Sequence, residues 1–173
     1  DVIRSLATLA SIRYLGDFFR DELLTALELI EKGYVERSEL RGSWAGAMGH
    51  TQFMPSSYMK YAVDQTGDGH ADIWTSTSDA IASTANYLKG YGWTPGLPWG
   101  IEVVVPDGFD HNLYRASFSS FRSAGVRRAD GGSLPSSGDA RLFYPAGHTG
   151  PALLLTANFD VIKKYNSSDA YAL

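Results

Sequence analysis

The chain has 173 residues, a formal net charge of -4 and no cysteine, so disulfides and thiolate metal sites are excluded. Its acidic balance argues against a nucleic-acid partner, because no basic field exists to displace counterions from phosphates. With 44% hydrophobic and 20% charged residues, the composition predicts one globular domain, or a core with a small inserted subdomain.

Two helices are predicted at the start of the chain. Apolar residues recur at a helical period through residues 2–14, and Gly16 then breaks the pattern. Asp17 is a suitable N-cap for the second helix, and Gly33 supplies a left-handed stop. The apolar stripe of this second helix consists of Phe19, Leu23, Ala26, Leu27 and Ile30. We interpret the pair as core scaffold.

A segment rich in small residues follows, ahead of a helix that begins at Pro55. It reads Gly42-Ser43-Trp44-Ala45-Gly46-Ala47-Met48-Gly49-His50-Thr51-Gln52-Phe53-Met54-Pro55-Ser56-Ser57. Its small residues let a backbone or a ligand approach closely, and Ser43 and Gln52 present polar groups from this tightly packed segment. From the residues alone, the segment is either a turn that contacts a ligand or a close crossing of two helices.

The next loop carries the start of a calcium-binding pattern. Such loops place oxygen ligands at positions 1, 3 and 5 and a backbone carbonyl at position 7. Asp64, Thr66, Asp68 and the carbonyl of His70 fit these positions, whereas Thr75 replaces the usual bidentate glutamate at position 12. The alternative is a structural turn held by aspartate side chains.

The residue composition changes in the second half of the chain. Ser78 is expected to cap a helix with a buried stripe of Ile81, Ala85 and Leu88. From residue 94, prolines and turn clusters separate short β-type runs, which predicts a small antiparallel β subdomain over 94–150.

The chain is then expected to return to helix. Leu153–Thr156 suits a closing strand of the β subdomain, and Asn158 is expected to cap a final helix through Tyr165.

The 42–57 segment closely resembles the signature of the lytic murein transglycosylase B family, enzymes that cleave peptidoglycan glycan strands without water. Further matches follow in the same order: Tyr61-Ala62-Val63-Asp64 leading into Gly67-Asp68-Gly69, Ala85-Asn86-Tyr87-Leu88, Asn158-Phe159-Asp160, and Lys164-Tyr165-Asn166-Ser167-Ser168-Asp169-Ala170-Tyr171-Ala172-Leu173. The resemblance implies an α+β fold, with a mainly helical, lysozyme-like core and a small inserted antiparallel β subdomain. We expect a helical core over 1–93, the β subdomain over 94–150, and a return to the core over 151–173.

The resemblance also implies a mechanism. In this family a single Glu acts first as acid and then as base, the N-acetyl group of the muramoyl sugar stabilises the intermediate, and the 6-hydroxyl attacks to give a 1,6-anhydro product. That Glu lies in a Glu-Ser or Glu-Thr motif upstream of the first helix seen here, and the sequence contains no matching motif. The catalytic residue is therefore unknown within this chain, which we expect to be truncated at both ends and inactive by itself.

Residue roles follow from the family pattern. Ser43 would hold the N-acetyl group, and Gln52 would hydrogen-bond the sugar. The cleft would be lined by Tyr87 and closed by Tyr165, Asn166 and Tyr171. No cofactor is implied for catalysis. Members with this loop end it in a later aspartate, so a structural calcium ion would be held by Asp64, Thr66, Asp68, His70 and Asp79, with Asp72 as the alternative to Asp79.

Two other functions remain open. The chain is a non-catalytic peptidoglycan-binding module if the upstream motif is missing, or a water-using glycosidase if carboxylates such as Glu39 and Asp64 act together. The expected partners are peptidoglycan glycan strands in the bacterial periplasm, with membrane attachment only through a lipid anchor outside this chain. Loss of an upstream helix would also expose Leu6 and Leu9.

Overall fold

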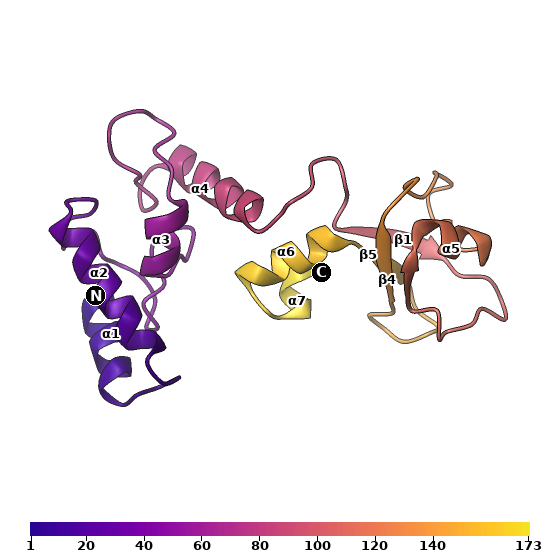
Figure 1. Cartoon of the computed structure of the whole chain (residues 1–173), viewed down its shortest axis with the longest axis horizontal. Helices are drawn as coiled ribbons and strands as arrows, with labels where there is room; N and C mark the ends of the chain where they lie inside the picture. Colours follow the sequence, from indigo (N-terminus) through magenta and orange to yellow (C-terminus); the bar gives the residue numbers. More distant parts are fainter. The chain divides into compact units, whose positions relative to one another are not determined.

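Residues 1–90 contain four helices joined by loops, whereas residues 91–173 are built on a five-stranded sheet with three helices. These are the two units of the computed structural model, which describes residues 1–173 (Figure 1). No helix combines the length and the apolar character that crossing a membrane would require.

The helices of the first unit are α1 (Val2–Ser11), α2 (Phe18–Glu31), α3 (Pro55–Tyr61) and α4 (Thr77–Gly90). Each packs against the next in chain order. Asp1 caps α1 by accepting a hydrogen bond from the backbone N–H of Arg4, and α3 begins at Pro55 as predicted.

Leu6 and Leu9 lie inside the first unit, so the expectation that they would be exposed is wrong. Leu6 has no exposed surface, and Leu9 has 9%. The segment that follows α2 covers Leu6, because a Cβ atom placed on Gly46 would lie 2.4 Å from Cδ2 of Leu6. The small residues of this segment therefore allow a loop to pack directly on α1.

The predicted stripe of α4 is also wrong, since Ile81 is 66% exposed. The helix instead buries Asp79, Ala80, Ser83 and Tyr87. Hydrogen bonds explain this orientation, because Asp79 and Ser83 accept backbone N–H groups from the loop before the helix. Satisfying buried backbone groups takes precedence over burying the more apolar face.

The α2 helix departs from its predicted stripe in a similar way. It exposes 46% of Leu27 but buries Glu22, which has only 4% of its surface exposed. Asp17 stands at the N-cap position without making a side-chain capping bond, and Gly33 stops the helix with φ of +70°.

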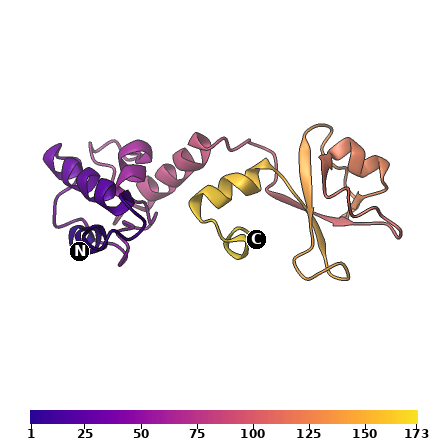
Figure 2. The ribbon, with the colours of Figure 1, turned by 60° about the horizontal axis from the view of Figure 1, so that its bottom comes forward.

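In the second unit, a single antiparallel sheet runs in the order β2-β4-β5-β1-β3. Its strands are β1 (Gly100–Val104), β2 (Arg115–Ser117), β3 (Arg127–Arg128), β4 (Asp139–Phe143) and β5 (Ala152–Leu155), and α5 (Phe118–Ser123) follows β2. Figure 2 shows the same unit from a second direction, with α5 beside the strands. The core between them includes Phe118, Phe121 and Leu154, each with at most 1% exposed. The predicted α+β class with a small antiparallel sheet is thus confirmed.

The chain ends in α6 (Ala157–Tyr165) and α7 (Asp169–Ala172), which pack together. Thr156, not Asn158, caps α6, because its hydroxyl oxygen accepts the backbone N–H of Asn158. Asn158 is fully buried instead, and its amide group binds the backbone of Thr94 and Leu97. The predicted assignment of 151–173 to the helical core stays a prediction.

Candidate functional site

A compact bridged loop carries the first two predicted sugar contacts. Isolated β-bridges join Gly42 to Met48 and Met48 to Phe53, so residues 42–53 fold back on themselves twice. Gly42 is required here, because a Cβ atom would lie 1.9 Å from the carbonyl oxygen of Ala47. This close approach orients the side chains between the bridges.

Ser43 is half-buried in that loop, and its hydroxyl oxygen organises the turn. It accepts hydrogen bonds from the backbone N–H groups of Ala45 (3.2 Å) and Ala47 (3.1 Å). Both lone pairs of the hydroxyl oxygen are thus engaged, which leaves its own proton for an acceptor outside the loop. A carbonyl oxygen, such as that of an N-acetyl group, is a suitable acceptor.

Gln52 adopts a left-handed backbone conformation with φ of 52°. For a residue other than glycine this conformation costs free energy, and such residues concentrate at ligand sites. The side-chain Nε2 of Gln52 donates to the carbonyl oxygen of Gly49 over 2.9 Å. The side-chain amide is exposed and is held in one direction by this bond, and its predicted contact with sugar stays a prediction.

Tyr87 lies beneath this loop, with 7% of its surface exposed. Its ring packs against Phe53 at 5.4 Å and against Tyr61 at 5.0 Å between centroids. The aromatic cluster therefore packs against Phe53, the residue that follows Gln52 in the bridged loop. Its predicted contact with sugar stays a prediction.

Trp44 was not among the predicted site residues, although it follows Ser43 directly. It is 74% exposed, which is unusual for the largest aromatic side chain. Exposed aromatic rings offer apolar faces to the C–H surfaces of sugars. The sequence contained an indication of this exposure, since a tryptophan flanked by small residues is not part of the apolar face of a helix.

The remaining predicted contacts lie together at the turn between α6 and α7. Tyr165 ends α6 and is half-buried, Asn166 accepts the backbone N–H of Ser168 over 3.0 Å, and Tyr171 is 56% exposed. These residues belong to the 91–173 unit, whereas Ser43, Gln52 and Tyr87 belong to the 1–90 unit.

The aspartate-rich loop is held by its own carboxylates. Asp64 accepts from the backbone N–H groups of Gly67 (2.6 Å) and Gly69 (2.7 Å) and from the hydroxyl of Thr66. The bond from Gly69 is the main reason that the pKa of Asp64 lies below its ordinary value. Asp68 accepts only from the backbone N–H of His70.

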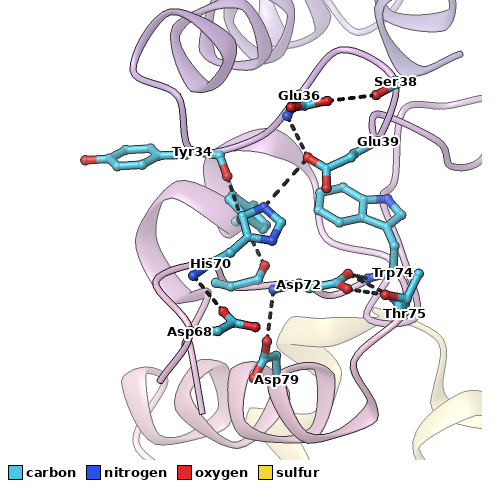
Figure 3. Close-up of polar contacts among 12 residues, drawn as sticks. Tyr34, Glu36, Ser38, Glu39, Asp68, His70, Asp72, Trp74, Thr75 and Asp79 are labelled. Atoms are coloured by element: carbon cyan, nitrogen blue, oxygen red, sulfur yellow. Dashed lines mark hydrogen bonds and ion pairs between the residues drawn. The ribbon is translucent and has the colours of Figure 1, made fainter. Parts of the chain in front are cut away.

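Asp79 anchors the loop from α4. It is fully buried, and its two oxygens accept backbone N–H groups from Gln65, Thr66 and Asp72 (Figure 3 shows the bond from Asp72). Burial alone would raise the pKa of Asp72, but bonds from Thr75 and Trp74 outweigh it and lower that pKa.

Calcium requires a cage of several oxygen atoms around one point. No group of three or more His, Cys, Asp or Glu side chains lies in position to hold an ion. Asp79 is turned toward backbone N–H groups, and the ring of His70 points away to Glu39, with 3.7 Å between Nε2 and Oε2 (Figure 3). Asp64 and Asp68 supply suitable hard oxygens, so the donor chemistry fits calcium, whereas the side chains as they lie form no closed cage.

Glu22 is the buried carboxylate that the sequence patterns did not single out. It accepts from the backbone N–H (2.9 Å) and the hydroxyl (2.6 Å) of Ser56, in the first turn of α3. This placement suits a helix-capping role, since the N-terminus of a helix favours negative charge. Glu39 is likewise engaged, because it accepts the backbone N–H of Glu36.

Comparisons with known proteins identify the family of this chain. Residues 1–173 match the transglycosylase SLT domain family, and the chain belongs to this family. It is 37% identical to the membrane-bound lytic murein transglycosylase B of Escherichia coli, over 99% of this chain and 48% of that protein.

Solved structures give the same assignment. SltB3 from Pseudomonas aeruginosa, in complex with NAG-anhNAM-pentapeptide, is 51% identical, with a TM-score of 0.91 over 99% of this chain and 48% of that one. The lytic transglycosylase Slt35 of E. coli, solved in complex with calcium, is 36% identical, with a TM-score of 0.77 over 99% of this chain and 55% of that one. The chain thus spans about half the length of these relatives.

Proposed function

We propose that this chain is the substrate-binding part of a lytic transglycosylase, which cleaves the MurNAc–GlcNAc bond of peptidoglycan to give 1,6-anhydromuropeptides. The main support is the bridged loop, where Ser43 and Gln52 are held as polar groups beside the exposed ring of Trp44. Relatives solved with NAG-NAM-pentapeptide and NAG-anhNAM-pentapeptide support the substrate class.

Each of these groups has a role in the proposed cleavage. Cleavage develops positive charge at the sugar carbon, which the N-acetyl oxygen of the same sugar stabilises by approaching it. Ser43 Oγ–H donates to that N-acetyl group and fixes its orientation. Gln52 binds a sugar hydroxyl, and the ring of Trp44 excludes water from one face of the sugar. Positioning of this kind lowers the entropic part of the barrier.

The acid that protonates the leaving oxygen is proposed to come from outside these residues. Glu22 is buried and accepts two hydrogen bonds from Ser56, and Glu39 accepts the backbone N–H of Glu36. General acid catalysis contributes about a hundred- to ten-thousand-fold, so we expect the 173-residue chain to bind glycan and to cleave only traces of it.

The aspartate-rich loop is proposed to take up calcium for stability. Asp64, Thr66, Asp68 and the carbonyl of His70 would supply oxygens, and Asp79 would join them only after exchanging its backbone partners for the ion. A relative solved with calcium supports this assignment. The bacterial periplasm is the proposed location, since peptidoglycan is the proposed substrate and one relative is a murein transglycosylase described as membrane-bound.

Mass spectrometry of digested sacculi tests the proposed activity. The full product of the gene is expected to release muropeptides with 1,6-anhydro ends, and Ser43→Ala is expected to reduce that rate at least tenfold. Ser38→Ala is the matched control on an exposed turn. Reducing muramic acid ends would instead indicate hydrolysis, and binding without any cleavage would indicate a glycan-binding module.

A further inference from the structure

A pocket of about 330 Å³ opens in the second unit, where β2, β4 and β5 meet the start of α6. Four charged side chains line it: Arg115, Asp139, Arg141 and Asp160. None of them belongs to the predicted sugar-binding residues, and no salt bridge within 4.0 Å involves any of the four. Arg115, Asp139 and Asp160 are exposed and Arg141 is half-buried, so a charged ligand can reach all four side chains.

The two arginines face each other across the sheet. Arg115 and Arg141 are direct cross-strand partners in the antiparallel β2–β4 pair, so their side chains share one face. Like charges placed directly opposite destabilise a sheet. An anion between the two guanidinium groups would remove that repulsion and accept their planar arrays of N–H donors.

Arg141 is held in place for such a role. Its guanidinium carbon lies 5.7 Å from the ring centroids of both Phe143 and Phe159. These cation–π contacts limit the rotamers of a side chain that is otherwise flexible. Beyond the pocket, the charge of Arg141 helps to lower the pKa of Asp169, but the main partner of that carboxylate is Lys163 at 2.6 Å.

Asp139 and Asp160 supply the negative charges of the pocket. Asp139 lies two residues before Arg141 on β4 and therefore on the same face, and Asp160 projects from the first turn of α6. A cation placed between these carboxylates would sit beside an anion placed between the arginines. The pocket therefore suits a ligand that carries both charges a few ångströms apart.

We propose that this pocket binds the peptide stem of peptidoglycan, through a free carboxylate at Arg115 and Arg141 and an ammonium group at Asp139 and Asp160. The proposal rests on the proposed function, because a peptide that carries both groups is attached to the glycan that this family cleaves. The proposed peptide subsite lies wholly within the second unit.

Titration calorimetry with a stem pentapeptide that carries no glycan and is acetylated at its N-terminus, so that its side-chain amine is its only cation, tests the proposal on the 173-residue chain. Arg115→Gln is expected to raise the Kd about fivefold, as is normal for losing one exposed ion pair. Arg115→Lys should restore part of the affinity, and Arg122→Gln on the exposed face of α5 is the matched control. Asp160→Asn should raise the Kd for the pentapeptide without affecting an analogue whose side-chain amine is acetylated.

Chemical variants of the peptide show whether binding depends on its carboxylates. Amidation of its carboxylates should weaken binding at least as much as Arg115→Gln, and the two changes together should add nothing further. Equal affinities of the free and amidated peptides, or of wild type and Arg115→Gln, would overturn the proposal, as would a wild-type chain that binds no pentapeptide. Peptide-free glycan strands titrated in parallel report on the sugar subsite alone, so their failure to bind would refute the proposed function instead.

Discussion

Gly46 lies against α1 so closely that a single added methyl group has no space. Its φ is +87°, and a Cβ atom would lie 2.4 Å from Leu6 Cδ2. We expect Gly46→Ala to lower the free energy of unfolding by about 2–4 kcal/mol, through combined backbone strain and overpacking. Chemical denaturation measures this effect, with Gly96→Ala as the control, because Gly96 has a similar φ of +78° but no neighbour within 4 Å. Equal losses in both variants would assign the cost to backbone strain alone.

Glu22 illustrates a residue whose role depends on distant sequence. Glu22→Gln replaces one carboxylate oxygen with an N–H₂ group that cannot accept a hydrogen bond from Ser56. We expect a loss of about 0.5–2 kcal/mol in the free energy of unfolding, since the N-terminus of α3 loses the negative charge that its backbone N–H groups favour. Thermal or urea denaturation measures it. The exposed Glu31→Gln on the same helix should change stability by less than about 0.5 kcal/mol, and a similar loss there would contradict the capping role.

At the scale of elements, the aspartate-rich loop should respond to acid. The folded pKa values of Asp64 and Asp72 lie below the ordinary value of 3.8. Their contribution to stability is therefore fully present above pH 3.8 and is lost as the pH falls through the lower, folded values. NMR titration of the Gly67 and Gly69 amides, which bind Asp64, should show the change below pH 3.8. Asp64→Asn should abolish this titration, and a midpoint above pH 4 would contradict the assignment.

Calcium should stabilise the same loop by binding the folded state only. At a concentration of 100 times its Kd, calcium would add about 2.7 kcal/mol to the free energy of unfolding and so raise Tm. Asp68→Ala should abolish that rise, whereas Asp107→Ala in an exposed turn should keep it. An unchanged melting curve for chelator-stripped wild-type protein on adding calcium would show that the loop is a purely structural turn.

Local signals predicted the start of α3 and the end of α2, but not which face α2 and α4 bury. Pro55 and Gly33 act on their own backbone, so the start of α3 and the end of α2 could be predicted from neighbouring residues. The buried face of α4 depends on Asp79 binding a loop up to 14 residues earlier, and Glu22 binds Ser56 across 34 residues. Periodicity carries no information on such partners, because it reports only average polarity along one element.

The candidate site shows the same division between local and distant information. The turn that holds Ser43 was recognisable from its small residues, whereas the strained backbone of Gln52 has no signature in the residue type itself. The charged pocket was missed entirely, since Arg115 and Arg141 become neighbours only through strand register.

For the whole molecule, the order of the strands has a consequence for its behaviour at high concentration. The two outermost strands, β2 and β3, are only three and two residues long and begin with Arg115 and Arg127. Short, positively charged edge strands offer few backbone groups to a second copy and repel the identical edge strand of that copy. They should therefore oppose edge-to-edge pairing of sheets into fibrils. Arg127→Val should therefore increase light scattering of concentrated, warmed protein, whereas Arg127→Lys should not.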